Sequence, residues 1–116
     1  MSREIKLPAD PGQALEALCE ASADGPVVVF KHSPICPVST AALHRFRSWL
    51  AGVDPGAKLG VAHIDVIAER ELARGLVAAV DVRHESPQAL WFAKGELTWH
   101  GSHTGIDAAA LDRELG

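Results

Sequence analysis

Val27-Val28-Val29-Phe30 runs directly into Lys31-His32-Ser33-Pro34-Ile35-Cys36-Pro37, and this stretch decides the fold. Its four leading apolar residues are mostly β-branched and uninterrupted. Continuous rather than alternating hydrophobicity is typical of a strand buried on both faces, as in a parallel sheet covered by helices. Further on, apolar side chains recur at helical spacing from Ala41 to Leu50, which predicts a helix reaching about Gly52. A buried strand, a turn with a cysteine and a helix therefore follow one another.

The residues upstream of this stretch predict a weak strand and a short helix. Residues 4–7 alternate polar and apolar side chains, as a short edge strand does. Asp10 is a residue type favoured at the N-cap of a helix, and Pro11 fits the first helical turn. The apolar face of the expected helix is formed by Leu15, Leu18 and Cys19. We expect this helix to end near Gly25-Pro26.

Downstream residues predict one more central strand, two helices and a hairpin. The expected ranges are a strand at 60–66, a helix at 69–80, strands at 88–93 and 97–100 around a turn at 94–96, and a helix ending at 115. Thr104, with Asp107 three residues later, is predicted to cap the last helix.

The resulting element order is β-α-β-α-β-α-β-β-α. The βαβ portion implies parallel strands with right-handed crossovers, and the hairpin adds an antiparallel edge. We therefore expect an α/β fold in which helices cover both faces of a central mixed sheet. The chain has 116 residues and shows neither a repeat nor a linker, so residues 1–116 are expected to form a single domain.

Composition narrows the range of functions. The chain is 47% hydrophobic and 22% charged, as ordinary globular proteins are, and its net charge of −4 argues against binding nucleic acid through its phosphates. No apolar run approaches the roughly 20 residues that a membrane span requires, so no membrane association is expected. The first ten residues lack the apolar core of a secretory signal, which predicts a cytoplasmic location. In that reducing compartment the two cysteines, Cys19 and Cys36, are expected to be free thiols.

Cys36 occupies the position where chemistry is most expected. It follows a buried strand and directly precedes Pro37, which fits the first turn of the next helix. Unpaired backbone N–H groups and the positive end of a helix dipole favour a thiolate at such a place. Lys31 and His32 are close in sequence and are expected to add positive charge. Together these features predict a lowered pKa for the Cys36 thiol and a nucleophile that attacks disulfides.

The spacing after Cys36 favours chemistry with a single thiol. A second cysteine three residues later would make a dithiol site, but Ser39 stands there, so no internal disulfide can close at that position. We expect the Ser39 hydroxyl to donate a hydrogen bond to the Cys36 thiolate. Cys19 is interpreted as a small hydrophobic residue of the first helix. A resolving role for Cys19 stays open, provided that its side chain is exposed.

Four segments together carry a resemblance to a known family. They are Phe30-Lys31-His32-Ser33, Cys36-Pro37-Val38-Ser39, His84-Glu85-Ser86-Pro87-Gln88 and Trp99-His100-Gly101-Ser102-His103. The element order resembles the thioredoxin superfamily, and these segments resemble the monothiol bacilliredoxin family, whose active-site pattern is T-C-P-I-S. Ile35 replaces the threonine of that pattern and Val38 its isoleucine. The lost hydroxyl at Ile35 is expected to alter substrate contacts rather than the class of protein.

The resemblance implies a thioredoxin fold and a role in removing bacillithiol from S-bacillithiolated proteins. Carried over by position, Cys36 is the attacking thiol, while Pro37 and Ser39 shape its site. Pro87 is then the cis-proline, and the Ser86 backbone offers hydrogen-bonding groups to an extended substrate.

Four of the six histidines are interpreted as site residues rather than metal ligands, and His44 and His63 as packing or surface residues. Their spacing does not match that of a zinc site, so no metal is expected. His32 is expected to set the pKa of the site or to face the substrate. His84, His100 and His103 are expected to lie at the rim near Pro87, with His84 and His103 as substrate-binding residues.

The resemblance also implies the partners. No cofactor is expected to be bound, and bacillithiol serves as the thiol co-substrate. A second bacillithiol, a partner redoxin or a flavin-dependent reductase would restore Cys36. Two alternatives remain: an iron–sulfur cluster protein that uses one cysteine per protomer, and a redox-inert adaptor with a thioredoxin fold.

Overall fold

One five-stranded mixed sheet forms the centre of the protein in a computed structural model that describes residues 3–116. The strands are β1 (Arg3–Glu4), β2 (Val27–His32), β3 (Gly60–Asp65), β4 (Gln88–Ala93) and β5 (Glu96–Ser102), and the helices are α1 (Pro11–Ala21), α2 (Pro37–Ala51), α3 (Arg70–Ala79) and α4 (Ala108–Leu115), with short 3₁₀ helices at Pro55–Ala57 and His103–Gly105. The strand order is β1-β3-β2-β4-β5. β3 lies parallel to β1 and β2, whereas β4 is antiparallel to both β2 and β5. The predicted element order and the mixed sheet are confirmed.

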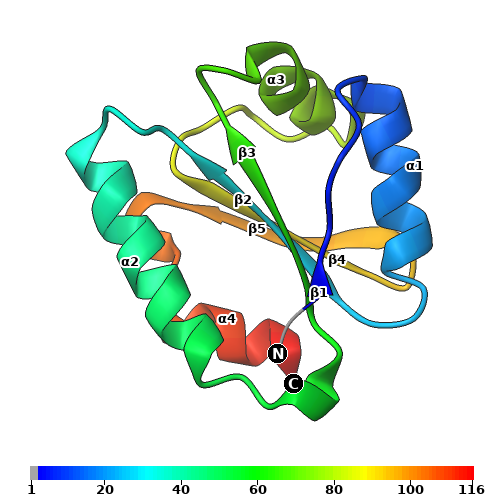
Figure 1. Ribbon diagram of the computed structural model, residues 1–116, viewed down its shortest axis with the longest axis vertical. Helices are drawn as coiled ribbons and strands as arrows, with labels where there is room; N and C mark the ends of the chain where they lie inside the picture. The colour runs from blue at the N-terminus through cyan, green and yellow to red at the C-terminus, as the bar shows by residue number, and fades with distance from the viewer. Residues whose placement is uncertain (1–2) are drawn as a thin grey trace.

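Helices cover both faces of the sheet (Figure 1). α1 and α3 pack on one face, where Leu18 and Leu76 belong to the same buried cluster. α2 and α4 pack on the other face, where Phe46 and Leu111 belong to a second cluster. The two clusters are separate because the sheet lies between them, as expected for a layered α/β domain.

β2 contributes to both clusters, which is why its sequence shows no alternation. Val27 and Val29 face the α1 and α3 side, whereas Val28 and Phe30 face the α2 and α4 side. All four side chains are completely buried. Successive side chains of a strand point to opposite faces, so a strand covered on both sides needs apolar residues at every position.

The helix starts follow local side-chain chemistry. Asp10 caps α1 as predicted, since its carboxylate accepts a hydrogen bond from Gln13 N at 2.9 Å. The predicted cap of α4 was wrong: Asp107, rather than Thr104, accepts from Ala110 N at 2.8 Å. Thr104 instead lies in the short 3₁₀ helix between β5 and α4, so α4 begins later than predicted.

The predicted edge strand at residues 4–7 is replaced by a two-residue strand, Arg3–Glu4, which within residues 3–116 pairs with β3. No helix within residues 3–116 is long and apolar enough to cross a membrane.

Gly75 offers a test of the α1–α3 packing. A Cβ at this position would lie 2.4 Å from Cγ of Pro11 and 2.8 Å from its Cβ. In a helix interior, exchange of glycine for alanine ordinarily stabilises by about 1 kcal/mol. Because the two helices must separate here, we expect Gly75→Ala to lower the free energy of unfolding by about 1–3 kcal/mol, measured by chemical denaturation. Ala78→Gly on the exposed side of α3 is the control and should cost about 1 kcal/mol. A Gly75→Ala protein that is more stable than the wild type would contradict this packing.

Candidate functional site

Cys36 is the N-cap residue of α2, directly before Pro37 at the first helical position. Its extended backbone (φ −104°, ψ 118°) changes the chain direction from β2 into the helix. Its carbonyl accepts from Thr40 N at 3.0 Å, and its N–H donates to Ser33 O at 3.3 Å. The side chain is partly exposed and is a free thiol. The first turn of a fifteen-residue helix therefore presents its open N–H groups and positive dipole end beside an accessible sulfur.

The Ser39 hydroxyl is used to build the turn rather than to contact the thiol. Ser39 is completely buried; its Oγ accepts from Ser33 N at 2.9 Å and lies 3.0 Å from His32 Nδ1. The expected hydrogen bond to Cys36 is absent from the described residues. The hydroxyl thus has a backbone donor on one side and the His32 ring on the other, and neither contact involves the thiol. Ser39 therefore shapes the loop between β2 and α2 from inside.

The loop before β4 lies at the same edge of the sheet as the Cys36 turn. In the ladder between β2 and β4, Lys31 pairs with Gln88, so Pro87 comes next to His32 one position further on. The Ser86–Pro87 peptide bond is cis, which confirms that expectation. Within residues 3–116, neither the N–H nor the C=O of Ser86 has a hydrogen-bond partner. Those two groups are free to pair with an extended chain.

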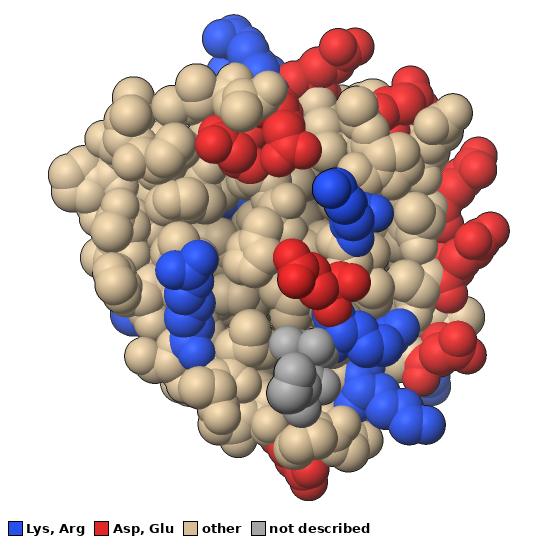
Figure 2. Space-filling model, in the orientation of Figure 1, with Lys and Arg blue, Asp and Glu red and all other residues tan. Residues whose placement is uncertain are grey.

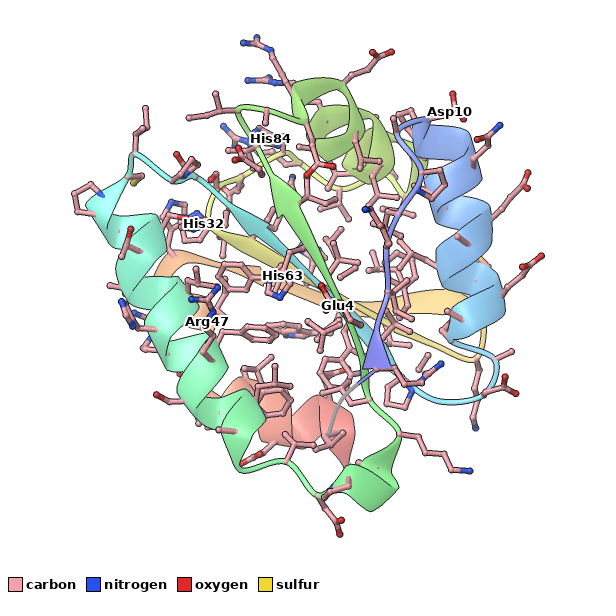
Figure 3. The ribbon with its side chains drawn as sticks, in the orientation of Figure 1. Glu4, Asp10, His32, Arg47, His63 and His84 are labelled. Carbon is pink, nitrogen blue, oxygen red and sulfur yellow. The ribbon has the colours of Figure 1, made fainter. Side chains whose placement is uncertain are left out.

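Lys31 does not lie where the sequence placed it. By alternation along β2 its side chain is on the α1 and α3 face, whereas His32 is on the α2 face (Figure 3). Its Nζ lies 2.8 Å from His84 Nδ1 and 2.6 Å from Gln88 Oε1. The expected role beside the thiol is replaced by contacts to the loop before β4. Burial lowers the pKa of Lys31 to about 8, the Arg74 charge adds to this shift, and Glu85 opposes it.

Gln88 connects Lys31 to the rest of that loop. Its Oε1 accepts from Lys31 Nζ and from Glu85 N at 3.2 Å, and its Nε2 donates to Arg83 O at 2.9 Å. The buried side chain of Gln88 thus connects the backbone of Arg83 and Glu85 to Lys31 of β2. Gln88 was not predicted as a functional residue, although it is part of the segment His84-Glu85-Ser86-Pro87-Gln88 on which the resemblance rests.

The turn after β5 also supports the Pro87 loop. His103 has a positive φ of 53°, and its N–H donates to Pro87 O at 3.2 Å. Arg45 of α2 donates through Nη2 to His103 O at 3.0 Å and through Nε to Ile106 O at 3.2 Å. Glu85 accepts a hydrogen bond from the Ser102 hydroxyl, which lowers the pKa of that carboxyl. His103 therefore holds the loop through its backbone. Arg45 was missed because it carries no signal beyond its place in an amphipathic helix.

Cys19 lies at the opposite end of the sheet from Cys36. Its carbonyl accepts from the Ser22 hydroxyl, and that hydroxyl accepts from Gly95 N in the hairpin turn after β4. The length of β4 separates this turn from Gln88, about 17 Å for a six-residue strand. A disulfide requires Cβ atoms about 4 Å apart, so Cys19 cannot resolve Cys36 in this fold.

The surface around Cys36 is apolar. Three large hydrophobic side chains are exposed in the described chain: Ile35 (80%), Val38 (52%) and Ile67 (52%). The first two flank Cys36, and Ile67 follows Val66, whose N–H donates to His32 O at the same edge. Figure 2 shows no charged side chains over the region where α2 begins, whereas acidic side chains gather over α1. The exposed apolar side chains that flank Cys36 are suited to contact with another protein.

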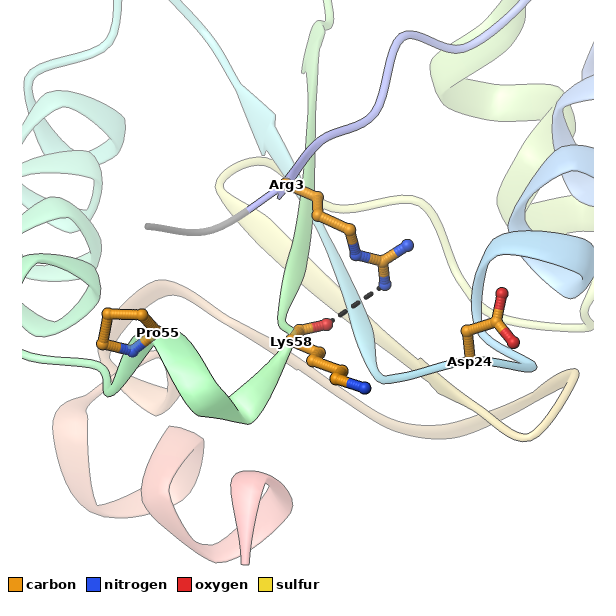
Figure 4. A pocket seen from close by; sticks show the side chains of 4 residues that line it. All are labelled: Arg3, Asp24, Pro55 and Lys58. Carbon is orange, nitrogen blue, oxygen red and sulfur yellow. Dashed lines mark hydrogen bonds between the residues drawn. The ribbon is translucent and has the colours of Figure 1, made fainter.

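A separate pocket lies at the other end of the sheet (Figure 4). It is lined by Arg3, Asp24, Pro55 and Lys58, and Arg3 donates to the Lys58 carbonyl at 3.1 Å. These residues precede β2 and β3, whereas Cys36 follows the carboxyl end of β2. The pocket is therefore not part of the thiol site. Within residues 3–116, no three or more His, Cys, Asp or Glu side chains converge on a possible metal position.

Solved structures with similar folds contain the same architecture. A protein described as a proposed oxidoreductase with a thioredoxin fold is 30% identical, with a TM-score of 0.78 over 97% of this chain and 94% of that one. The thioredoxin of Fasciola hepatica is 14% identical, with a TM-score of 0.67 over 96% of both chains. A mutant thioredoxin of Halobacterium salinarum NRC-1 is 18% identical, with a TM-score of 0.65 over 97% of this chain and 88% of that one.

The fold and the thiol turn define a thioredoxin-fold protein of the thiol oxidoreductase class. Residues 10–111 match the family described as monothiol bacilliredoxin BrxC. The chain belongs to the monothiol bacilliredoxin family.

The buried ammonium of Lys31 gives a prediction for stability. The folded protein releases the Lys31 proton near pH 8 and the unfolded chain only near 10.5. The unfolded state thus binds more protons between these values, so stability rises with pH across this window. Relative to Lys31→Met, we expect the wild-type free energy of unfolding to increase by about 1–2 kcal/mol from pH 8 to pH 10.5. A full shift would correspond to about 3 kcal/mol, and solvent screening reduces it.

The two proteins are compared by urea denaturation at each pH, so that the other titrating groups cancel. If the difference in the free energy of unfolding stays constant, or falls as the pH rises, then folding does not lower the pKa of Lys31.

Ser39→Ala tests the internal role of the hydroxyl. The substitution leaves the buried Ser33 N–H without its acceptor, and the expected loss is about 1–3 kcal/mol in the free energy of unfolding. Thr40→Ala in the same helical turn, where the hydroxyl is exposed, is the control and should cost less. Equal costs for the two variants would contradict a structural role for Ser39.

Proposed function

We propose that the protein removes bacillithiol from S-bacillithiolated proteins by thiol–disulfide exchange through Cys36. The observation that carries the proposal is an accessible thiol at the N-cap of α2 with no second thiol within reach. Membership of the monothiol bacilliredoxin family supports the choice of bacillithiol.

In the first step, the Cys36 thiolate attacks the bacillithiol sulfur of the mixed disulfide. A bond forms between these two sulfur atoms, and the bond to the protein sulfur breaks. The electron pair leaves with the protein thiolate, which then takes up a proton from water. Cys36 now carries bacillithiol, and the target protein has regained its thiol.

The second step requires a thiol from outside the chain. Ser39 has no sulfur, and Cys19 lies at the far end of β4, so neither can release the adduct. A bacillithiol thiolate attacks the adduct and leaves as bacillithiol disulfide, which restores the Cys36 thiolate. A partner redoxin or a flavin-dependent reductase would supply the electrons that reduce this product.

The surroundings of Cys36 suit such a substrate. The open N–H and C=O of Ser86 can pair with an extended segment of the target protein. The exposed Ile35 and Val38 contribute an apolar contact area next to the sulfur. In this proposal His32, bound to the Ser39 hydroxyl, lies on the side of α2 where the reacting sulfurs meet.

Transfer of the adduct is the direct test. Reduced wild type, Cys36→Ser and Cys19→Ser are mixed with an S-bacillithiolated protein, and the intact masses are recorded over time. We expect one bacillithiol adduct on the wild type and on Cys19→Ser, with equal release of the free target protein. Cys36→Ser should show neither, since its hydroxyl cannot perform the exchange.

Iodoacetamide labelling of Cys36 in the wild type is the control for access. If Cys36 is labelled and yet no adduct transfers, the proposed function is wrong, and cluster binding or an adaptor role would take its place. Absorbance in the visible region after anaerobic purification would then separate these two alternatives.

A further inference from the structure

The cluster of Lys31, His84 and Gln88 is the most unusual feature outside the thiol turn. Lys31 has no exposed surface, and both groups that its Nζ contacts belong to the segment leading into β4. A buried ammonium is costly unless each of its protons finds an acceptor. Here one acceptor, His84, lies in the loop before β4, and the other, Gln88, is the first residue of β4 and holds that loop through Glu85 N and Arg83 O.

An ammonium has three donors and no acceptor, and this fixes the state of the histidine ring. Nδ1 of His84 lies 2.8 Å from Lys31 Nζ, so Nδ1 must be the acceptor. The proton of the neutral ring is then on Nε2. The charges that face the ring agree with a neutral state. Burial, Lys31 of β2, and Arg74 and Arg70 of α3 lower the pKa of His84, and only Glu85 opposes them.

The Nε2–H group of the half-buried His84 is not used within the protein. No residue between 3 and 116 hydrogen-bonds to this nitrogen, and it is not among the buried polar atoms without a partner. His84 lies toward α3 in Figure 3, two residues before Ser86, whose backbone groups are also open. One loop therefore contains both a fixed ring donor and an open stretch of backbone.

We propose that Lys31 is a positioning residue which holds this loop and sets His84 as an Nε2–H donor for a carboxylate of the small thiol. This inference rests on the thiol-transfer function proposed above. Arg70 and Arg74 place further positive charge on the same side, which favours an anionic acceptor over a neutral one. Lys31 acts through His84 and Gln88 and does not touch the reacting sulfurs.

The ring of His84 can be observed without any activity. Long-range ¹H–¹⁵N spectra of the wild type at pH 7 should show His84 neutral with its proton on Nε2. In Lys31→Met we expect a mixture of tautomers and a pKa of His84 closer to its ordinary value. Lys6→Met, at an exposed lysine, is the matched control and should leave the ring signals unchanged. A wild-type ring protonated on Nδ1 would overturn the proposal even if the variant fails to fold.

The proposed preference for an anionic small thiol is tested with two mixed disulfides that share the same peptide thiol. One carries mercaptosuccinate, with two carboxylates, and the other carries the neutral mercaptoethanol. Cys36 attacks the small-thiol sulfur in both, and the peptide thiolate leaves, so comparison between variants cancels intrinsic reactivity. We expect the ratio of the two rates to fall about tenfold in both Lys31→Met and His84→Phe, which is the lower end of the effect of one hydrogen bond to a charged group. Lys6→Met should keep the wild-type ratio.

Iodoacetamide labelling of Cys36 should proceed within about twofold of the wild-type rate in each variant, because none changes the thiol turn. An unchanged ratio in Lys31→Met and His84→Phe would overturn the assigned role of His84. If the wild type exchanges with neither probe nor with an S-bacillithiolated protein, the proposed function fails, and the ring spectra still decide whether Lys31 sets the His84 tautomer.

Discussion

The antiparallel pairing of β2 with β4, with Lys31 opposite Gln88, is the constraint on which the thiol site depends. This register brings the start of β4 to the end of β2, so the cis-proline loop and the Cys36 turn share one edge of the sheet. The last two residues of β2 then point to opposite faces and hold one loop each. Lys31 binds Gln88 and His84 on one side, while His32 binds the hydroxyl of the α2 turn on the other. A one-residue slip would exchange these faces and separate both loops from their supports.

The layered fold could be predicted from the sequence because its signals are local and mutually consistent. The unbroken apolar run of β2 requires cover on both faces, and the structure places a separate core on each. Asp10 could be recognised as a cap because its acceptor and the N–H that it binds are three residues apart. The same rule was wrong at α4, where both Thr104 and Asp107 are suitable caps. A local rule cannot decide between two suitable residues when the path of the preceding strand determines where the helix begins.

The site was only partly predictable, because its polar side chains depend on pairing between distant segments. Cys36 could be placed from its neighbours alone, since a strand, a proline and a helix define its position. Lys31 appeared to belong to the thiol because it is five residues away in sequence, yet alternation along β2 directs it to the other face. Its partner Gln88 is 57 residues away. Ser39 was likewise assigned to the nearest reactive atom, whereas a buried hydroxyl first satisfies the backbone around it. Arg45 could not be found, because its acceptors are carbonyls of a turn some 60 residues later.

The fold also determines why the proposed cycle depends on an external thiol. A resolving cysteine at residue 39 would have to leave a completely buried position that now anchors the turn, so the serine there is part of the architecture. Cys19 is held near the hairpin at the far end of β4. Any adduct on Cys36 therefore persists until a second molecule arrives, and the same edge must receive two partners in succession. The exposed Ile35 and Val38 and the open backbone of Ser86 suit a protein segment, whereas the ring of His84 is the donor proposed for the small thiol. In the proposed cycle the target protein leaves in the first step, so the second thiol meets Cys36 when only the small-thiol adduct remains on it.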